Sequence, residues 1–290
     1  MKPNGQDRLD GKVVLVTGGN AGVGKETAVG LAARGAHVVI TSRNQQRGAG
    51  AVADIRARSG NDAVEVMPLD LASLPSIHDF ARDFLARSER LDVLIDNAGL
   101  VMGQRTETED GFETTFGVNH LGHFQLTNLL LDRLRASAPS RIVVVSSHAH
   151  KQARHGLDFD DLQSEQGYKP FDAYSKSKLA NIYFARELAR RLEGSNVSAN
   201  ALHPGFVASR FGRDGDMGTM VGLGMVLVRP FAINSTKGAR TSIWLASAPE
   251  GAATSGGYFF RCAPSTPSGI AQHDEAARRL WAASEELVKL

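Results

Sequence analysis

Cysteine is almost absent from this 290-residue sequence, which contains only Cys262. A single cysteine cannot form an internal disulfide, so we expect a reducing compartment and predict the cytoplasm. Long apolar runs are also missing. Residues 1–10 hold no apolar stretch, and the most apolar later segment, residues 220–233, is interrupted by two glycines, an arginine and a proline. We therefore expect neither a signal peptide nor an integral membrane segment.

An excess of charge of one sign is missing too. The 33 basic and 31 acidic residues give a formal net charge of +2, and no long run of like charge occurs. A protein that binds nucleic acid would show a basic patch or stripe, so we expect no nucleic-acid partner. The hydrophobic content of 42% is ordinary for a globular protein. A chain of this length can bury a large core without disulfides or metals.

Short β-branched runs alternate with helical segments along the chain. The expected strands are 12–17, 36–41, 63–69, 91–96, 141–146, 197–202 and 258–260. The expected helices are 21–34, 44–58, 73–88, 111–135, 172–192, 235–247 and 274–290. This alternation predicts parallel strands joined by right-handed crossovers. The predicted fold class is α/β, a single Rossmann-type domain with a doubly wound seven-stranded parallel sheet and helices on both faces.

We assign residues 1–290 to this one domain, because no linker, repeat or low-complexity stretch divides the chain. Its cofactor half is expected at about 10–140 and its catalytic and substrate half at about 141–290. Two segments break the alternation, 148–171 and 206–234, and long loops inside a compact domain are usually functional.

A glycine-rich turn joins the first expected strand to the first expected helix, and it reads Thr17-Gly18-Gly19-Asn20-Ala21-Gly22-Val23-Gly24. Gly18 permits a tight turn, Gly22 lets the backbone approach a pyrophosphate, and Gly24 allows close packing of helix and strand. The N-terminus of the helix offers free N–H groups and the positive end of its dipole. The spacing differs from Gly-x-Gly-x-x-Gly, but its context predicts a dinucleotide site. The contacts are expected at Thr17, Gly18, Asn20, Gly22, Val23 and Gly24.

The second expected strand is followed by Ser42-Arg43. A site for NAD would place a carboxylate here for the ribose 2′-hydroxyl, and none is present. The guanidinium of Arg43 suits a 2′-phosphate, and Ser42 can add a hydrogen bond. We therefore predict NADP(H) as the cofactor, with a solvated arginine at a helix start as the alternative.

Two further strand ends are candidates for the adenosine part of the cofactor. Asp70, which Leu71 follows, can hydrogen-bond the adenine amino group or cap the next helix, and the residues leave both open. Asn97, Ala98 and Gly99 bring small residues to the next strand end. They let the backbone approach the adenine ribose, although turn chemistry explains them about as well.

Polar residues with catalytic chemistry follow in order. Asn119 lies in a Gly-Val-Asn-His-Leu-Gly-His-Phe segment, and Ser147 follows the fifth expected strand. Tyr174 and Lys178 form a Tyr-x-x-x-Lys pair on one face of a helix. In this order the motifs resemble those of the short-chain dehydrogenase/reductase family over nearly the whole chain. The segments 111–124, 146–150 and 161–164 resemble its retinol-dehydrogenase-like branch, which includes WW-domain oxidoreductases.

The resemblance implies hydride transfer between a nicotinamide and a carbonyl or alcohol group. Tyr174 would be the general acid, and Ser147 would hydrogen-bond the carbonyl oxygen, with Ser146 on the opposite strand face as a competitor. Bringing a tyrosine pKa from ~10 to near 7 requires roughly 4 kcal/mol, about what a cation at ~4 Å supplies, and Lys178 is placed to be that cation. Asn119 resembles the family residue that holds a water beside this lysine.

The segment after the sixth strand resembles the family's nicotinamide-binding turn. The residues concerned are Pro204, Gly205, Val207 and Ser209, which join Tyr174 and Lys178 as cofactor contacts. The sequence departs from the family pattern at Ser209, where threonine is usual, and at Asp96, where an asparagine is usual. The gap of 27 residues from Ser147 to Tyr174 is longer than in minimal members, so the oligomeric state, including a homo-oligomer, stays open.

The segment 206–234 combines many apolar residues with five glycines. We expect it to be a mobile lid over a lipophilic substrate, with an oligomer contact or a membrane-surface patch as the alternatives. His148, His150 and His155 lack the spacing of metal ligands, so we expect no metal site. The predicted function is an NADPH-dependent oxidoreductase for aldehydes, ketones or the corresponding alcohols. The alternative is an NADP-binding sensor or scaffold without turnover, which would not need Tyr174 and Lys178.

Overall fold

One sheet runs through the computed structural model, which describes residues 7–206 and 234–290. Its strands are β1 (Val13–Val16), β2 (His37–Ser42), β3 (Val64–Pro68), β4 (Val93–Asp96), β5 (Ser140–Val145), β6 (Val197–Leu202), β7 (Tyr258–Phe260) and β8 (Ala263–Pro264). Their order is β3-β2-β1-β4-β5-β6-β7-β8, and neighbouring strands are parallel except for β7 and β8. The predicted doubly wound sheet is confirmed, and its strand order reverses between β1 and β4.

The eighth strand is a correction to the predicted seven. β8 pairs antiparallel with β7 through a two-residue turn formed by Arg261 and Cys262, whose φ angles are 52° and 60°. Such turns usually carry Asn-Gly or Asp-Gly, because these residues tolerate positive φ. Arg-Cys gives no such signal, so the hairpin was missed. The predicted count of seven holds for the parallel strands.

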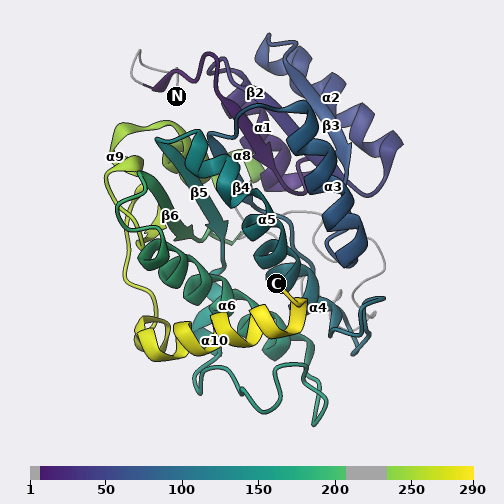
Figure 1. The fold of residues 1–290 in the computed structure, drawn as a ribbon, viewed down its shortest axis with the longest axis vertical. Helices are drawn as coiled ribbons and strands as arrows, with labels where there is room; N and C mark the ends of the chain where they lie inside the picture. Colours follow the sequence, from purple (N-terminus) through teal and green to yellow (C-terminus); the bar gives the residue numbers. More distant parts are fainter. Residues whose placement is uncertain (1–6, 207–233) are drawn as a thin grey trace.

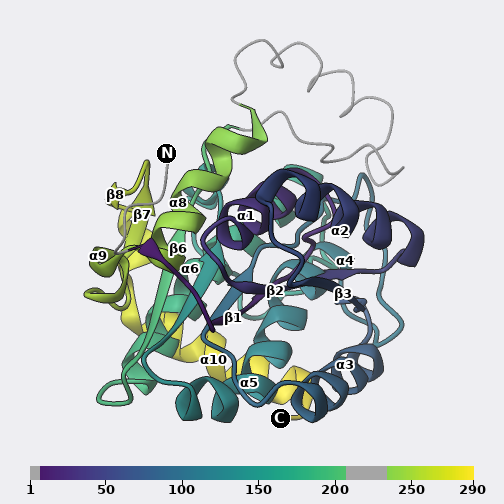
Figure 2. The same cartoon turned by 90° about the horizontal axis from the view of Figure 1, so that it is seen from above.

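Helices cover both faces of the sheet (Figure 1). They are α1 (Gly22–Ala32), α2 (Gln45–Ser59), α3 (Leu74–Arg87), α4 (Thr114–Phe116), α5 (Gly122–Ala136), α6 (Pro170–Arg191), α8 (Ser235–Ser247), α9 (Pro249–Ala252) and α10 (Asp274–Val288). Figure 2 shows α1, α2 and α8 on one side of the strands and α3, α5 and α10 on the other. This is the predicted arrangement of helices on both faces.

The residues of the central strands alternate between two hydrophobic cores. Val14 and Val16 of β1 pack into the core under α1 and α2, whereas Val13 and Leu15 pack into the core under α3, α5 and α6. Successive side chains of a strand point to opposite faces, so a strand buried on both faces is apolar throughout. Leu15 is fully buried, and burial of a leucine contributes roughly 1.5–3 kcal/mol.

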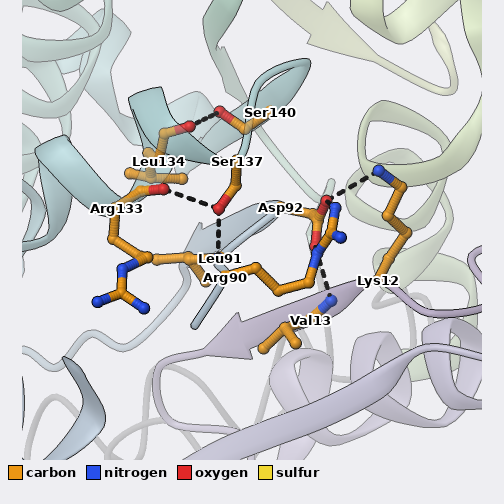
Figure 3. A network of polar contacts seen from close by, with 9 residues as sticks. All are labelled: Lys12, Val13, Arg90, Leu91, Asp92, Arg133, Leu134, Ser137 and Ser140. Carbon is orange, nitrogen blue, oxygen red and sulfur yellow. Dashed lines mark hydrogen bonds and ion pairs between the residues drawn. The ribbon is translucent and has the colours of Figure 1, made fainter. Parts of the chain in front are cut away.

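The amino ends of β1 and β4 are joined by a polar network around Asp92 (Figure 3). The buried carboxylate accepts hydrogen bonds from Lys12 Nζ and from the backbone N–H of Val13, both at 2.9 Å, and from Arg90. Burial alone would raise the pKa of Asp92, but the hydrogen bonds from Arg90 and Lys12 outweigh it and lower the pKa. Nearby, Ser137 accepts from the Leu91 N–H at 2.9 Å. This network fixes the end of the sheet opposite the site described below.

The single helix expected over 111–135 is wrong in its first half. Glu113 accepts from the N–H groups of Thr115 and Phe116 at 2.7 Å and begins the short helix α4. A π-helical turn, η2 (Gly117–Leu121), then joins α4 to α5. π-turns often occur at functional sites and have no simple sequence signal. Asn119 lies in this turn.

The expected lid at 206–234 lies outside the described residues apart from Phe206 and Asn234, and so do Val207 and Ser209. Within the described part of the chain, no helix combines the length and apolarity needed to cross a bilayer.

Candidate active site

A cavity of about 1200 Å³ opens at the carboxyl ends of the parallel strands. Its wall includes residues that follow or end each strand from β1 to β7. Ligands of open α/β sheets bind at this edge, beside the point where the strand order reverses. A typical ligand pocket holds roughly 300–1,000 Å³. The cavity therefore has room for a dinucleotide and a second, smaller molecule.

The glycine turn forms one part of this wall. Gly18 has a φ of 63°, and a Cβ on it would lie 3.1 Å from the Ala98 side chain. A Cβ on Gly24 would lie 2.4 Å from Asn97 Nδ2 and 2.5 Å from the Gly18 carbonyl oxygen, so only glycine packs here. The expectation that Gly24 allows close packing of α1 is confirmed.

The N-terminus of α1 suits an anion. Its N-cap, Ala21, makes no side-chain capping bond, and no acidic residue lies in the first turn. By contrast, α2, α3 and α8 are capped by the side chains of Asn44, Ser73 and Asn234. The first N–H groups of α1 thus face the cavity without a side-chain acceptor, as a pyrophosphate site requires.

Thr17 takes a different place from the one expected. It is fully buried and lies behind the wall, where its hydroxyl accepts from the N–H groups of Asn97 at 2.8 Å and Ala98 at 3.0 Å. Asn97 Nδ2 in turn donates to the Thr17 carbonyl at 2.8 Å. Thr17 therefore shapes the cradle by holding Asn97 and Ala98 beside the glycine turn.

Two arginines follow β2 at the edge of the cavity. Arg43 and Arg47 are both exposed and line the wall one helical turn apart. Arg47 was missed from the sequence, although its i,i+4 spacing from Arg43 places both on one side of the start of α2. Ser42 also lines the wall, but its hydroxyl donates to the Asn44 carbonyl at 2.8 Å.

Asp70 is the one acidic residue among the described residues that line the cavity. One of its carboxylate oxygens accepts from the Ala72 N–H at 3.0 Å, which forms a tight turn. The cap of α3 is Ser73, which accepts from the Ser76 N–H at 3.2 Å. The helix-capping alternative for Asp70 is therefore wrong, and Asp70 lies in the wall beside Leu71.

The structure brings nearly all the expected contacts to the one cavity. The described cofactor candidates in its wall are Gly18, Asn20, Gly22, Val23, Gly24, Ser42, Arg43, Asp70, Leu71, Asn97, Ala98, Gly99, Tyr174, Lys178, Pro204 and Gly205. Ser147 shares this wall, whereas Thr17 and Asn119 lie behind it.

Tyr174 and Lys178 extend from α6 into the cavity. Burial raises the pKa of Tyr174 to about 12, and a hydrogen bond with Ser147 acts in the opposite direction. Burial lowers the pKa of Lys178 to about 8. Lys178 Nζ lies 5.8 Å from the centre of the Tyr174 ring and donates to the Val145 carbonyl at 3.1 Å. The pKa of Tyr174 is therefore raised by burial, with Ser147 opposing it, and not lowered toward neutrality as expected from the sequence.

The two neighbouring serines have separate partners. Ser146 is buried, and its hydroxyl donates to the Lys178 carbonyl at 2.7 Å, which attaches α6 to the end of β5. Ser147 accepts from the Ala149 N–H at 3.1 Å and hydrogen-bonds with Tyr174. Of the two hydroxyls, that of Ser147 lies beside the tyrosine.

Asn119 joins the π-turn to the catalytic helix. Its side chain bonds both backbone groups of Leu100, at 2.8 and 2.9 Å, and donates to Ser177 at 3.0 Å. A Cβ on Gly99 would lie 3.2 Å from both Asn119 Oδ1 and Lys178 Nζ, so these groups meet at Gly99. His123, which was missed from the sequence, links the Asn119 carbonyl at 3.1 Å to the Thr17 hydroxyl at 2.9 Å.

A second group of residues lines the other end of the cavity, and of these only Phe206 was expected at the substrate, as the first residue of the lid. These residues are His148, Lys151 and Gln152 of η3 (His148–Gln152), Lys169, Pro170 and Phe171 at the start of α6, and Phe206 and Phe260. Except for Phe206 and Phe260, they lie in the long segment between Ser147 and Tyr174, which was their only sequence signal.

The histidines of this region have local partners. His150 uses both ring nitrogens, at 2.7 Å from the Ser147 carbonyl and 3.1 Å from the Ser268 N–H. His155 is exposed. Among residues 7–206 and 234–290, no group of three or more histidine, cysteine or acidic side chains is placed to hold a metal ion.

A parallel sheet with a phosphate cradle and an adjacent tyrosine–lysine pair defines a nicotinamide-dependent oxidoreductase. Residues 12–158 match the family model for short chain dehydrogenases. Human retinol dehydrogenases 14 and 12 are each 47% identical to the chain, covering 97% of it and 88% and 87% of their own length. The chain belongs to the short-chain dehydrogenase family, in its retinol-dehydrogenase-like branch.

Solved structures agree with this assignment. An uncharacterised protein from Mycobacterium paratuberculosis is 35% identical, with a TM-score of 0.77, and the match covers 97% of this chain and 95% of that one. The RhlG/NADP active-site complex from Pseudomonas aeruginosa is 26% identical, with a TM-score of 0.71, and the match covers 93% and 100% of the two chains.

Proposed function

We propose that this protein is an NADPH-dependent oxidoreductase that reduces an aldehyde or ketone to the alcohol, or catalyses the reverse reaction. The observation that carries the proposal is the common cavity, in which Tyr174, Ser147 and Lys178 face the same space as the cradle around Gly18. The cofactor supplies the hydride when it is bound. The protein must supply the proton and stabilise the charge that develops on oxygen.

Tyr174 is the proton donor in this proposal. The carbonyl oxygen of the substrate accepts hydrogen bonds from Ser147 and Tyr174, and the phenol proton moves to that oxygen as the carbon gains hydride. With a pKa of about 12, Tyr174 holds its proton at neutral pH and is ready to donate it. In the reverse reaction it must first lose that proton, so alcohol oxidation is expected to increase with pH.

Lys178 lowers the free-energy cost of this proton transfer by stabilising the phenolate that Tyr174 becomes. With a pKa of about 8, its ammonium is mostly charged at pH 7. If the 5.8 Å between Nζ and the ring centre is taken as the separation, with an effective dielectric constant near 20, this charge stabilises a phenolate by roughly 3 kcal/mol, or about two pKa units. Asn119 and Ser146 hold the helix that carries both residues, so we assign them positioning roles.

NADP(H) is the proposed cofactor because of the charges at the end of β2. Arg43 and Arg47 line this part of the cavity. An NAD site would have an acidic residue at the end of β2 to bind the ribose 2′-hydroxyl, and this sequence has Ser42-Arg43 there instead. A guanidinium binds a phosphate through paired, charge-assisted hydrogen bonds.

We propose that the cofactor half of the domain lies at about 10–140, the catalytic and substrate half at about 141–290, and the lid at about 206–234.

The substrate is proposed to be lipophilic, as the names of the human retinol dehydrogenases indicate for those relatives. Phe171 and Phe206, with 58% and 48% of their surface exposed, give the cavity mouth an apolar lining. Retinal and other long-chain aldehydes are the first substrates to test.

The test of the function is Tyr174→Phe. This variant keeps the ring but removes the proton donor, so kcat should fall by about 10²–10⁴-fold while NADPH still binds. Turnover is measured as NADPH consumption with a panel of aldehydes and ketones, and cofactor binding by calorimetry. Circular dichroism of both proteins controls for folding. If the variant keeps more than about a tenth of wild-type kcat, Tyr174 is not the acid.

A second variant tests the role of Lys178, and the substrate panel distinguishes an enzyme from a sensor. Lys178→Met removes the cation beside the phenolate, so the pH at which alcohol oxidation is half-maximal should move upward by about two units. A sensor or scaffold protein would bind NADPH and turn over no member of the panel. That result would overturn the enzymatic proposal.

A further inference from the structure

The end of the cavity beyond Tyr174 is basic. Lys151 and Lys169 line it together with His148 and His203, and no acidic residue among the described ones lines this end. Asp70, the one acidic wall residue in the described chain, follows β3 at the cofactor end. The catalytic set therefore separates two positively charged regions, one at Arg43 and Arg47 and one at the two lysines.

These two lysines differ from the lysines of the described chain that form ion pairs. Lys12, Lys25 and Lys176 form ion pairs with aspartates at 2.8 to 3.0 Å. Within residues 7–206 and 234–290, no carboxylate pairs with Lys151 or Lys169, and both side chains are exposed. An ammonium that lines a cavity without a carboxylate partner is available to an anionic ligand.

The histidines of the wall respond to this positive charge. Burial lowers the pKa of His203 to about 4, and His148, His150, Lys151 and Arg261 lower it further. Lys151 and His148 act on His150 in the same direction. The charged groups that act on either ring are all basic, in agreement with a positively charged cavity end.

Aromatic surface lies beside these cations. Phe171 packs against Tyr174 with ring centres 6.2 Å apart, and Phe260 stacks on His203 at 4.0 Å. Phe206 lines the same end. An apolar body can therefore lie between the reacting carbonyl at Tyr174 and a charged group at the lysines.

We infer that the preferred substrate is an amphipathic carbonyl compound whose apolar body ends in an anionic group, a carboxylate or a phosphate, bound by Lys151 and Lys169. This inference rests on the proposed function and narrows its substrate class. The phosphates of the cofactor do not account for the lysines, because the cradle and the arginines lie at the ends of β1 and β2. The lysines instead belong to η3 and to the start of α6.

Three matched probes test the inference: 10-oxodecanoate, its methyl ester, and 10-oxodecyl phosphate. All carry the same aldehyde and nearly the same chain, so the ester is the neutral reference. We compare kcat/KM at saturating NADPH. The wild type should prefer one or both anions over the ester by at least fivefold, and the preference should decrease with added salt. The two anions distinguish a carboxylate from a phosphate source.

Variants of the two lysines show which positive charges bind the anionic group of the substrate. Lys151→Gln and Lys169→Gln should each reduce the anion-to-ester ratio by about fivefold, which corresponds to the ~1 kcal/mol of an exposed ion pair. Lys151→Arg should restore most of the ratio. Lys289→Gln, at the far end of α10, removes the same charge outside the cavity and should leave the ratio unchanged.

Each outcome is decisive. If the ester is turned over but the anions are not preferred, the inference is wrong and the proposed function stands. The inference is also wrong if a preference survives both Lys→Gln variants or falls equally in Lys289→Gln. If Tyr174-dependent turnover is absent with all three probes and with the neutral panel, the proposed function itself has failed.

Discussion

At the end of β4, Asp96 is a fully buried carboxyl with little to stabilise its charge. One oxygen accepts from the Thr127 hydroxyl at 3.0 Å, and the other has no hydrogen-bond partner among the described residues. Burial raises the pKa of Asp96 to about 8, against ~3.9 in an unfolded chain. The folded state therefore binds more protons than the unfolded state between these values. The contribution of Asp96 to the free energy of unfolding is therefore highest below pH 4 and is lost as the pH rises toward 8.

Asp96→Asn should remove this loss. The amide is neutral and can accept the same hydrogen bond from Thr127, so the variant should be more stable than the wild type by about 2–4 kcal/mol at pH 7–8 and nearly equal at pH 4. Urea unfolding at pH 4.5, 6 and 8 measures the difference. Parallel pH dependence in the two proteins would show that Asp96 is ionised in the folded state.

Residue types and their order, together with the family resemblance, predicted many of the side chains that meet at the cavity. Ser147, Tyr174 and Lys178 were identified from a strand end and from a helical i,i+4 pair, and Gly24 from a turn that excludes a Cβ. The pKa of Tyr174 was not predictable in this way, because it depends on how burial balances a cation at a distance that the sequence does not contain. Thr17 was expected to contact the cofactor but is fully buried behind the cavity wall. Its burial depends on how the strands and the turns pack, which the sequence does not show directly.

At the scale of single elements, the strands were predicted well and one helix was not. β6 and β7 have the predicted bounds, and the other parallel strands differ from prediction by one or two residues at most ends. Buried parallel strands are apolar throughout, which is a strong signal. The π-turn Gly117–Leu121 has no such signal, because its side chains are as apolar as those of the α-helix that follows.

The segment from this turn into α5 carries two buried neutral histidines. Burial lowers the pKa of both His120 and His123 to about 3. The Asn119 carbonyl can only accept, so His123 Nδ1 carries the proton and Nε2 accepts from the Thr17 hydroxyl. An unfolded histidine has a pKa of ~6.5, so the unfolded state binds more protons as the pH falls. Each histidine therefore costs about 1.4 kcal/mol of stability per pH unit below pH 6.

His123→Gln should flatten this acid sensitivity. Glutamine is neutral and offers one donor and one acceptor, although its fit at pH 7 is expected to be poorer. Between pH 6.0 and 4.5 the wild type should lose about 2 kcal/mol more than the variant. The slope of unfolding free energy against pH is the measurement, because a packing defect shifts the curve without changing its slope. Equal slopes would mean that His123 is protonated in the folded protein.

At the scale of the whole molecule, the sheet order decides where the site lies. The alternation of strands and helices, with right-handed crossovers, predicted a doubly wound sheet, and its reversal between β1 and β4 places the ends of seven strands around one cavity. The hairpin of β7 and β8 and the basic end of the cavity at Lys151 and Lys169 were not predicted. Both depend on loops whose residues carry no periodic pattern.

A ligand that contacts strand ends on both sides of this reversal should stabilise the whole domain. At a free concentration of 100 Kd, a ligand that binds only the folded state adds about 2.7 kcal/mol. The entropy of unfolding of 290 residues is roughly 0.6 kcal/mol per degree. Saturation with NADPH should therefore raise Tm by about 4 °C, and NADH at the same concentration should raise it less.

Arg43→Ala tests whether this difference arises at the end of β2. Loss of a guanidinium–phosphate contact should weaken NADPH binding about 10- to 100-fold, so the Tm shift at the same NADPH concentration should fall to about 1–2 °C. The smaller shift with NADH should not change, because NADH has no 2′-phosphate. Arg82→Ala serves as the control, since Arg82 pairs with Asp79 and Asp83 on the exposed face of α3. Equal Tm shifts for the two cofactors in the wild type, or a loss of both in Arg43→Ala, would contradict NADP(H) selection by Arg43.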